Sequence, residues 1–128
     1  MIISDTSVWI EFLKKKEPFF TLQKRLLEER QVIALECIFG ELLQGAHNMR
    51  ESTLILDYWN NLPKIEEKGL WIDAGSLSGK LRLSAKGVGL IDAFILKAAD
   101  ASDSQIWTLD RKLTAVLPKD RVFAPNGQ

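Results

Sequence analysis

The chain has 128 residues, a length that fits one compact domain and requires no second one. Its 17 basic and 17 acidic side chains cancel, so no global positive field indicates nucleic-acid binding, and such a partner would have to meet local clusters. The single cysteine, Cys37, excludes an internal disulfide and a thiolate metal cluster, and no segment resembles a signal peptide or a membrane span. We therefore expect one soluble, cytoplasmic domain over residues 1–128.

Short apolar runs alternate with amphipathic segments in the first half of the chain. The run Ile2–Ser4 predicts a buried strand that leads into a helix beginning near Ser7, and Val32–Leu35 predicts a second strand. Between and after these two strands, the helical spacing of apolar residues predicts helices. The stripes that carry this spacing are Phe19, Leu22 and Leu26; Ile38, Leu42 and Gly45; and Ile55, Tyr58, Trp59 and Leu62.

The same alternation continues in the second half. Two further helical stripes are Leu70, Ala74, Leu77 and Leu81, and, after the breaker Gly87–Gly89, Ile91, Phe94, Ile95 and Ala98. The run Gln105–Leu109 predicts a third strand, and Val122–Phe123 an edge strand. Short strands separated by helices predict an α/β fold with a central, mostly parallel sheet and helices on both faces.

Acidic residues recur at places that such a sheet would bring together. Asp5 and Asp110 each follow a predicted strand, and ligands of open α/β sheets bind beyond the carboxyl ends of the strands. Glu41 borders an apolar stripe, and Asp92 lies in the first turn of an apolar helix, where we expect it to have a charged partner. The alternative for each acid is structural, because Asp5, Thr6 or Asp110 can cap a helix and Glu41 can be solvated.

Four carboxylates in one pocket repel one another, so a divalent cation is needed to hold them together. Oxygen ligands select a hard ion, which predicts Mg²⁺ or Mn²⁺ bound by Asp5, Glu41, Asp92 and Asp110. Such an ion activates water and neutralises a phosphate during hydrolysis. Hydroxyl groups that could support the site belong to Thr6, Ser7 and Thr108.

The sequence lacks the residues that several other classes of enzyme require. The only histidine is His47, which excludes a histidine-pair ribonuclease and disfavours a histidine-rich zinc site. No phosphate-binding Gly-x-x-x-x-Gly-Lys loop and no Gly-x-Gly-x-x-Gly fingerprint occurs. A dehalogenase-like phosphatase would need an aspartate two residues after Asp5, where the chain has Ser7.

The motifs that contain the four acids resemble those of PIN domains, and among them the small VapC-type toxins of toxin–antitoxin pairs. The resemblance runs from end to end in the order and spacing of its fragments. The matching fragments are Asp5–Ile10, Gly40–Ala46, Gly89–Ile95 and Thr108–Asp110.

This resemblance implies a three-layer PIN-like fold and a magnesium- or manganese-dependent endoribonuclease with Asp5, Glu41, Asp92 and Asp110 as its acidic centre. It also implies a cognate VapB-type antitoxin, a homodimer, and structured RNA of the translation machinery, such as tRNA or rRNA, as substrate.

Two segments depart from the family pattern. After Asp110 many members continue with an acid and an aromatic residue, whereas this chain has Arg111–Leu113, which shifts the expected metal binding toward the first three acids. The segment Ala98–Asp103 differs from the usual alanine-rich helix end, and its Asp100 and Asp103 are extra acids whose roles stay open.

Two other functions compete with the ribonuclease hypothesis. A noncatalytic PIN-like module would bind RNA or protein and use the acids as caps, although retention of all four acids counts against it. A metal-dependent DNA nuclease would need elements that thread or clamp DNA, for which the chain is short. Basic clusters that could contact phosphates are Lys14–Lys16, Lys24–Arg25, Lys80 with Arg82 and Lys86, and Arg111–Lys112, each alone typical of a solvated face.

Overall fold

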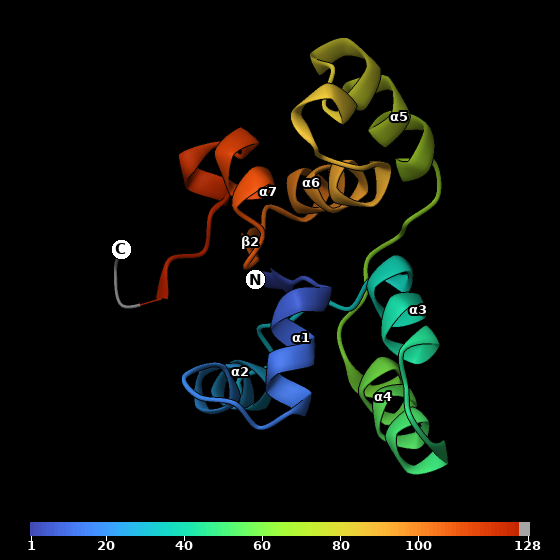
Figure 1. Cartoon of the computed structure of the whole chain (residues 1–128), viewed down its shortest axis with the longest axis vertical. Helices are drawn as coiled ribbons and strands as arrows, with labels where there is room; N and C mark the ends of the chain where they lie inside the picture. The colour runs from blue at the N-terminus through green and yellow to red at the C-terminus, as the bar shows by residue number, and fades with distance from the viewer. Residues whose placement is uncertain (126–128) are drawn as a thin grey trace.

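The computed structural model describes residues 1–125 and shows helices arranged around a short parallel sheet (Figure 1). In chain order its elements are β1 (Ile2–Ser4), α1 (Thr6–Leu13), α2 (Phe19–Glu28), α3 (Glu36–Gln44), α4 (Met49–Asn61), α5 (Leu70–Leu81), the 3₁₀ turn η1 (Ser84–Lys86), α6 (Leu90–Ser102), β2 (Gln105–Trp107), α7 (Arg111–Val116) and the 3₁₀ turn η2 (Lys119–Arg121).

The sheet consists of β1 and β2, which run parallel with Ile3 opposite Ile106. The backbone N–H of Asp5 donates to the carbonyl of Trp107 at 3.0 Å and extends this pairing by one residue. Both strands therefore end at the same edge, and Asp5 leaves the sheet at that edge.

The predicted strands at Val32–Leu35 and Val122–Phe123 do not form in the structure. Val32 and Val122 each join the sheet only through an isolated bridge, to Ile2 and Ile106 respectively. After Ile33 donates to Ile2 the chain leaves the sheet, and Ala34 donates to the carbonyl of Pro63 at 2.9 Å instead.

The predicted third strand is also shorter than expected. It ends at Trp107, because the next backbone donors bind side chains of the site instead of a neighbouring strand: Leu109 N–H donates to the Ser7 hydroxyl, and Asp110 N–H to the Thr108 hydroxyl.

Helices cover both sides of this small sheet. The helix α1 packs against β1, and α6 packs against β2. Figure 1 shows β2 and the N-terminus between α1 with α2 on one side and α6 with α7 on the other, while α3 and α4 form a pair at the flank. This arrangement confirms the predicted α/β class with helices on both faces.

The core is continuous beneath these helices, and its largest side chain is Trp9 at 1% exposure. The Trp9 indole lies 5.2 Å from the ring of Phe39 and 5.3 Å from that of Tyr58, measured between ring centres, which ties α1 to α3 and α4. The predicted stripes are largely buried, with three exceptions. Leu81 is 44% exposed because α5 ends at that residue, Ile91 in the first turn of α6 is 37% exposed, and Gly45 at the end of α3 is exposed.

Among residues 1–125, no helix combines the length and the apolar composition that crossing a membrane requires.

A buried polar pair joins α2 to β1 directly behind the site. Ser4 Oγ donates to Gln23 Oε1 at 2.9 Å, and both residues have no solvent exposure. Gln23 Nε2 has no hydrogen-bond partner among residues 1–125. A buried amide with one unmet donor is costly, so the pair is a sensitive point of the fold.

We expect Ser4→Ala to lower the free energy of unfolding by about 1–3 kcal/mol, because it leaves the Gln23 amide wholly unpartnered. The double variant Ser4→Ala/Gln23→Met should recover most of this loss, since both buried polar groups are then removed. Urea unfolding of Ser4→Ala, Gln23→Met and the double variant measures the coupling between the two residues. Strictly additive effects on the free energy of unfolding would contradict this coupling.

Candidate active site

Asp5 combines the two roles that the sequence left as alternatives. It is the N-cap of α1, with its Oδ1 accepting from the Val8 N–H at 3.2 Å, so Asp5 and not Thr6 caps this helix. The same oxygen accepts from Ser7 Oγ at 2.5 Å, and Oδ2 accepts from the Thr108 hydroxyl. Asp5 is only 7% exposed, and its burial raises the pKa of the carboxyl while these hydrogen bonds oppose the rise.

Two hydroxyl groups connect the ends of the two strands. Ser7 Oγ accepts from the Leu109 N–H at 3.1 Å, and Thr108 Oγ1 accepts from the Asp110 N–H at 3.0 Å. Since both hydroxyls donate to Asp5, they fix its carboxylate relative to the segment after β2.

Asp110 lies at the start of α7. Its Oδ1 accepts from the N–H groups of Lys112 at 2.9 Å and Leu113 at 3.4 Å, so it caps this helix as the alternative interpretation predicted. Within residues 1–125, both hydrogen bonds of this helix cap go to Oδ1, and Oδ2 of Asp110 takes no part in the cap.

Glu41 reaches the site from α3. Its Oε1 accepts from Thr6 Oγ1 at 2.6 Å, which places the glutamate beside the first turn of α1. Glu41 is exposed, and this one hydrogen bond connects it to the site. All three predicted supporting hydroxyls, on Thr6, Ser7 and Thr108, therefore contact a predicted acid.

Asp92 lies half-buried in the first turn of α6. Burial is the largest cause that raises the pKa of its carboxyl, followed by the negative charges of Asp110, Asp5 and Glu41, while a backbone hydrogen bond from Gly89 acts in the opposite direction. The structure thus brings the four acids within electrostatic range of one another. No side chain of residues 1–125 supplies the charged partner expected for Asp92, whose charged neighbours are the other acids.

The acids do not form a closed metal cage. Within residues 1–125, no three side chains of His, Cys, Asp or Glu approach closely enough to enclose an ion. Mg²⁺ commonly binds one or two carboxylates directly and keeps several waters, so it does not need such a cage. The donors here are all oxygens and carry excess negative charge, which is the chemistry that fits a hard divalent cation.

The extra acids Asp100 and Asp103 have a structural partner away from this centre. Arg121 Nε lies 3.1 Å from Asp100 Oδ1, and Arg121 Nη1 lies 3.0 Å from Asp103 Oδ1. These ion pairs join the end of α6 to η2. The sequence analysis missed them because Arg121 is distant along the chain and carries no motif.

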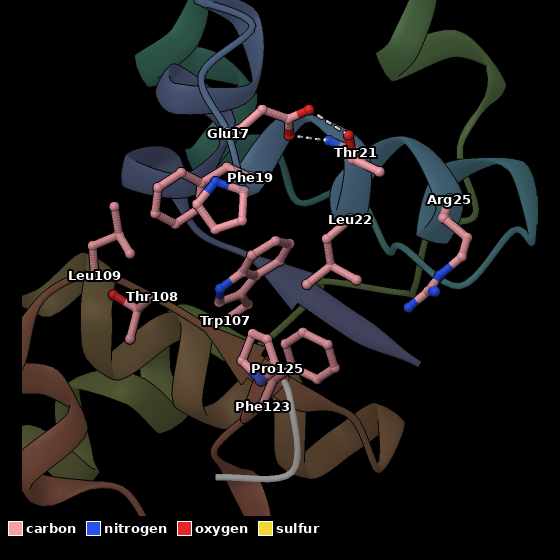
Figure 2. A pocket seen from close by; sticks show the side chains of 11 residues that line it. Glu17, Phe19, Thr21, Leu22, Arg25, Trp107, Thr108, Leu109, Phe123 and Pro125 are labelled. Carbon is pink, nitrogen blue, oxygen red and sulfur yellow. Dashed lines mark hydrogen bonds between the residues drawn. The ribbon is translucent and has the colours of Figure 1, made fainter.

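Two hollows have residues next to Asp110 in the sequence in their walls. One has a volume of about 690 Å³ and contains Thr108 and Leu109 in its wall, together with the aromatic residues Phe19, Trp107 and Phe123 (Figure 2). The other has a volume of about 550 Å³, and its wall contains the cations Lys86, Arg111 and Lys112. Trp107 belongs to the buried core at 4% exposure and also borders the first hollow, and its place directly before Thr108 is the sequence signal for that second role.

We expect Asp92→Asn to raise the melting temperature of the metal-free protein by a few degrees at pH 7. Because the folded state raises the pKa of Asp92, its stabilising contribution is complete below the unfolded value of about 3.9 and is lost as pH rises through the folded value. The advantage of the amide should therefore grow as pH rises above about 4.

Melting curves of both proteins from pH 3.5 to pH 7, in buffer that contains a chelator, measure this difference. The control is Asp73→Asn, which changes an exposed acid in the first turn of α5. An advantage of Asp92→Asn that does not vary with pH would contradict the electrostatic explanation.

Comparisons with known proteins agree with this arrangement. The family model described as the PIN domain matches residues 2–116. Ribonuclease VapC32 of Mycobacterium tuberculosis, from strain CDC 1551 / Oshkosh and from strain ATCC 25618 / H37Rv, is 29% identical to the chain over 126 residues, covering 95% of the chain and 94% of that protein. The resemblance to VapC-type PIN proteins is thereby confirmed. The chain belongs to the PIN domain family.

Proposed function

We propose that the protein is a divalent-metal-dependent endoribonuclease and the toxin of a VapBC-type toxin–antitoxin pair. The observation that carries this proposal is the convergence of Asp5, Glu41, Asp92 and Asp110 at one edge of the sheet, with Asp5 held by hydroxyls from both strand ends. The similarity to Ribonuclease VapC32 over nearly the whole chain supports the same activity.

The acids would hold Mg²⁺ or Mn²⁺, with Asp5 and Asp92 as the main ligands and Glu41 and Asp110 acting directly or through water. The bound ion would supply an activated water and neutralise the charge on the scissile phosphate. Ser7 and Thr108 orient the Asp5 carboxylate, and Thr6 positions Glu41.

Hydrolysis by water without a covalent enzyme intermediate suits the side chains present. The hydroxyls of Ser7 and Thr108 both donate to Asp5, which commits their protons to the carboxylate. Burial, then the charges of Glu67 and Glu41, raises the pKa of Cys37 to about 12, so this thiol stays protonated at neutral pH.

The hollow that contains Lys86, Arg111 and Lys112 supports RNA as substrate. None of these cations forms an ion pair with an acid of residues 1–125, and Lys112 directly continues the helix that Asp110 caps. Gly87, at φ +79°, allows the Lys112 stem to cross it, since a Cβ there would lie 2.8 Å from Lys112 Cδ. Cations without an ion pair in the residues that follow Asp110 would contact phosphates that flank the cleaved bond.

The proposal includes structured RNA of the translation machinery, with tRNA or rRNA as the expected class, and action in the cytoplasm. It also includes a VapB-type antitoxin. A groove of about 850 Å³ between α1, α3 and α4 has the exposed apolar residues Ile10 and Leu54 and the acid Glu41 in its wall, which suits an amphipathic partner segment. Exposed Trp71 and Ile72 on α5 suit a homodimer.

We expect Asp5→Asn and Asp92→Asn each to reduce Mg²⁺- or Mn²⁺-dependent RNA cleavage by at least about a hundredfold, because each removes a charged ligand. Both variants should also lose most of the rise in melting temperature that Mn²⁺ produces in the parent protein. Cleavage of labelled tRNA and rRNA fragments, with DNA of the same sequence in parallel, and melting curves with and without Mn²⁺ measure these effects.

The matched control is Asp103→Asn, since Asp103 is 95% exposed, lies outside the acidic centre and has a φ of +49° that asparagine tolerates. Full cleavage by Asp5→Asn would overturn the assignment. Stabilisation of the parent by Mn²⁺ without cleavage of either nucleic acid would favour the noncatalytic module, and preference for DNA would favour the DNA nuclease.

We expect the triple change Lys86→Gln/Arg111→Gln/Lys112→Gln to raise KM for RNA with little change in kcat, because these cations bind phosphates away from the broken bond. The slope of log binding constant against log salt should fall by about 2 for three lost contacts to a single strand. Lys14→Gln/Lys15→Gln/Lys16→Gln removes the same charge elsewhere, and an equal effect from this control would show that only net charge matters.

A further inference from the structure

The hollow beside Thr108 has features that the cleavage chemistry does not use. Its wall contains the three aromatic rings of Phe19, Trp107 and Phe123 and the single cation Arg25. In Figure 2, Thr108 and Leu109 stand at one end and Arg25 at the other, with the aromatic side chains between them. Its volume of about 690 Å³ lies within the range of pockets that bind small molecules.

Two residues in the wall of the hollow are hydrogen-bonded to the acidic centre. Thr108 contributes to its wall and donates its hydroxyl to Asp5. Leu109, the next residue in the wall, donates its N–H to Ser7, which also binds Asp5. A group that occupies the hollow is therefore adjacent to the carboxylate that the proposed function assigns to the metal.

The aromatic rings are arranged around Trp107. Its ring centre lies 6.1 Å from that of Phe19 and 5.3 Å from that of Phe123, and the Phe123 N–H donates to Ile106, which fixes this segment along β2. Trp107 is 4% exposed, whereas Phe19 and Phe123 are half-buried and keep part of their surface toward the hollow. Half-buried aromatic faces are the surfaces on which unpaired bases stack.

The charges at the rim favour one orientation of a nucleotide. Arg25 is exposed and forms no ion pair with an acid of residues 1–125, so it is available to a phosphate. Glu17, on the same wall, accepts from the N–H and the hydroxyl of Thr21, and these bonds lower its pKa, so its negative charge disfavours a phosphate there. A phosphate would be drawn to the Arg25 end.

We propose that this aromatic hollow binds the base of one unpaired nucleotide next to the scissile phosphate of an RNA substrate, with Arg25 contacting the neighbouring phosphate. The inference rests on the endoribonuclease function proposed above and deepens it. An unpaired base at this position requires that the cut bond lie in a loop, a bulge or an end of the structured RNA, because a paired base cannot reach the rings.

The test compares RNA with and without bases in protein that cannot cleave it. The protein is the full chain with Asp92→Asn, and the probes are fluorescein-labelled six-residue RNA of randomised sequence and the corresponding abasic chain. Fluorescence anisotropy in metal-free buffer gives both affinities. We expect Phe19→Leu and Phe123→Leu each to weaken the affinity for the base-bearing RNA about tenfold and to leave the affinity for the abasic chain unchanged. Arg25→Gln should weaken both.

Two matched controls separate the hollow from general effects on α2. Phe20→Leu makes the same change one residue after Phe19, but the Phe20 ring stacks on Phe12 and does not line the hollow. Lys24→Gln removes a charge beside Arg25, from a side chain that lies over the Phe20 ring. Leucine keeps the apolar contact, and melting curves confirm that each variant is folded. Neither control should change RNA affinity.

A second readout uses the cleaving protein with Asp92 restored. We expect Phe123→Leu to change which bases flank the cut sites, as mapped by sequencing RNA ends, while Phe20→Leu leaves them unchanged. Equal affinity for base-bearing and abasic RNA, or unchanged affinity in both phenylalanine variants, overturns the hollow as a base site even when cleavage persists. Absence of RNA cleavage by the unmutated protein with Mg²⁺ overturns the proposed function itself, and the inference with it.

Discussion

The site depends on the parallel pairing of β1 with β2 and on the hydroxyl bridge at their shared edge. Because the strands pair in parallel, Asp5 and Thr108 emerge side by side although they are 103 residues apart. Thr108 and Ser7 then each donate to one oxygen of Asp5. Ser7 also accepts the Leu109 N–H from the segment after β2, and Thr108 accepts the N–H of Asp110 in its own segment. The bonds that close the fold at this edge also orient the carboxylate, so stability and function share the same atoms.

The same arrangement concentrates negative charge that the protein itself does not neutralise. Asp92 is half-buried and is surrounded by the charges of the other acids, and no cation of residues 1–125 pairs with it. Cations are present nearby, but Lys86, Arg111 and Lys112 surround a separate hollow. Separate acidic and basic regions of this kind suit a divalent cation at the acids and the negatively charged phosphates of a substrate at the cations.

Much of the fold could be predicted from periodicity, because a buried face repeats at helical spacing whatever lies against it. The stripe through Ile55 and Trp59 lies in α4, which ends one residue before Leu62, and the one through Phe94 and Ala98 lies in α6. The strand near Val32 could not be placed correctly, since a short apolar run is buried equally well without a strand partner. The Ile33 N–H donates to Ile2, but the next donor, the Ala34 N–H, donates to Pro63, which the sequence does not indicate.

The sequence by itself determined the identity of the acids, their order and their positions after a strand, in a first helical turn or at the border of an apolar stripe, because these follow from local residue patterns. Only the tertiary structure decided their partners. It showed that Asp5 caps α1 and binds Thr108 at once, that Asp92 faces other acids and not a cation, and that Trp107 borders a hollow beside the site. Each of these depends on contacts between distant segments, and distance along the chain carries no information about which side chains meet in space.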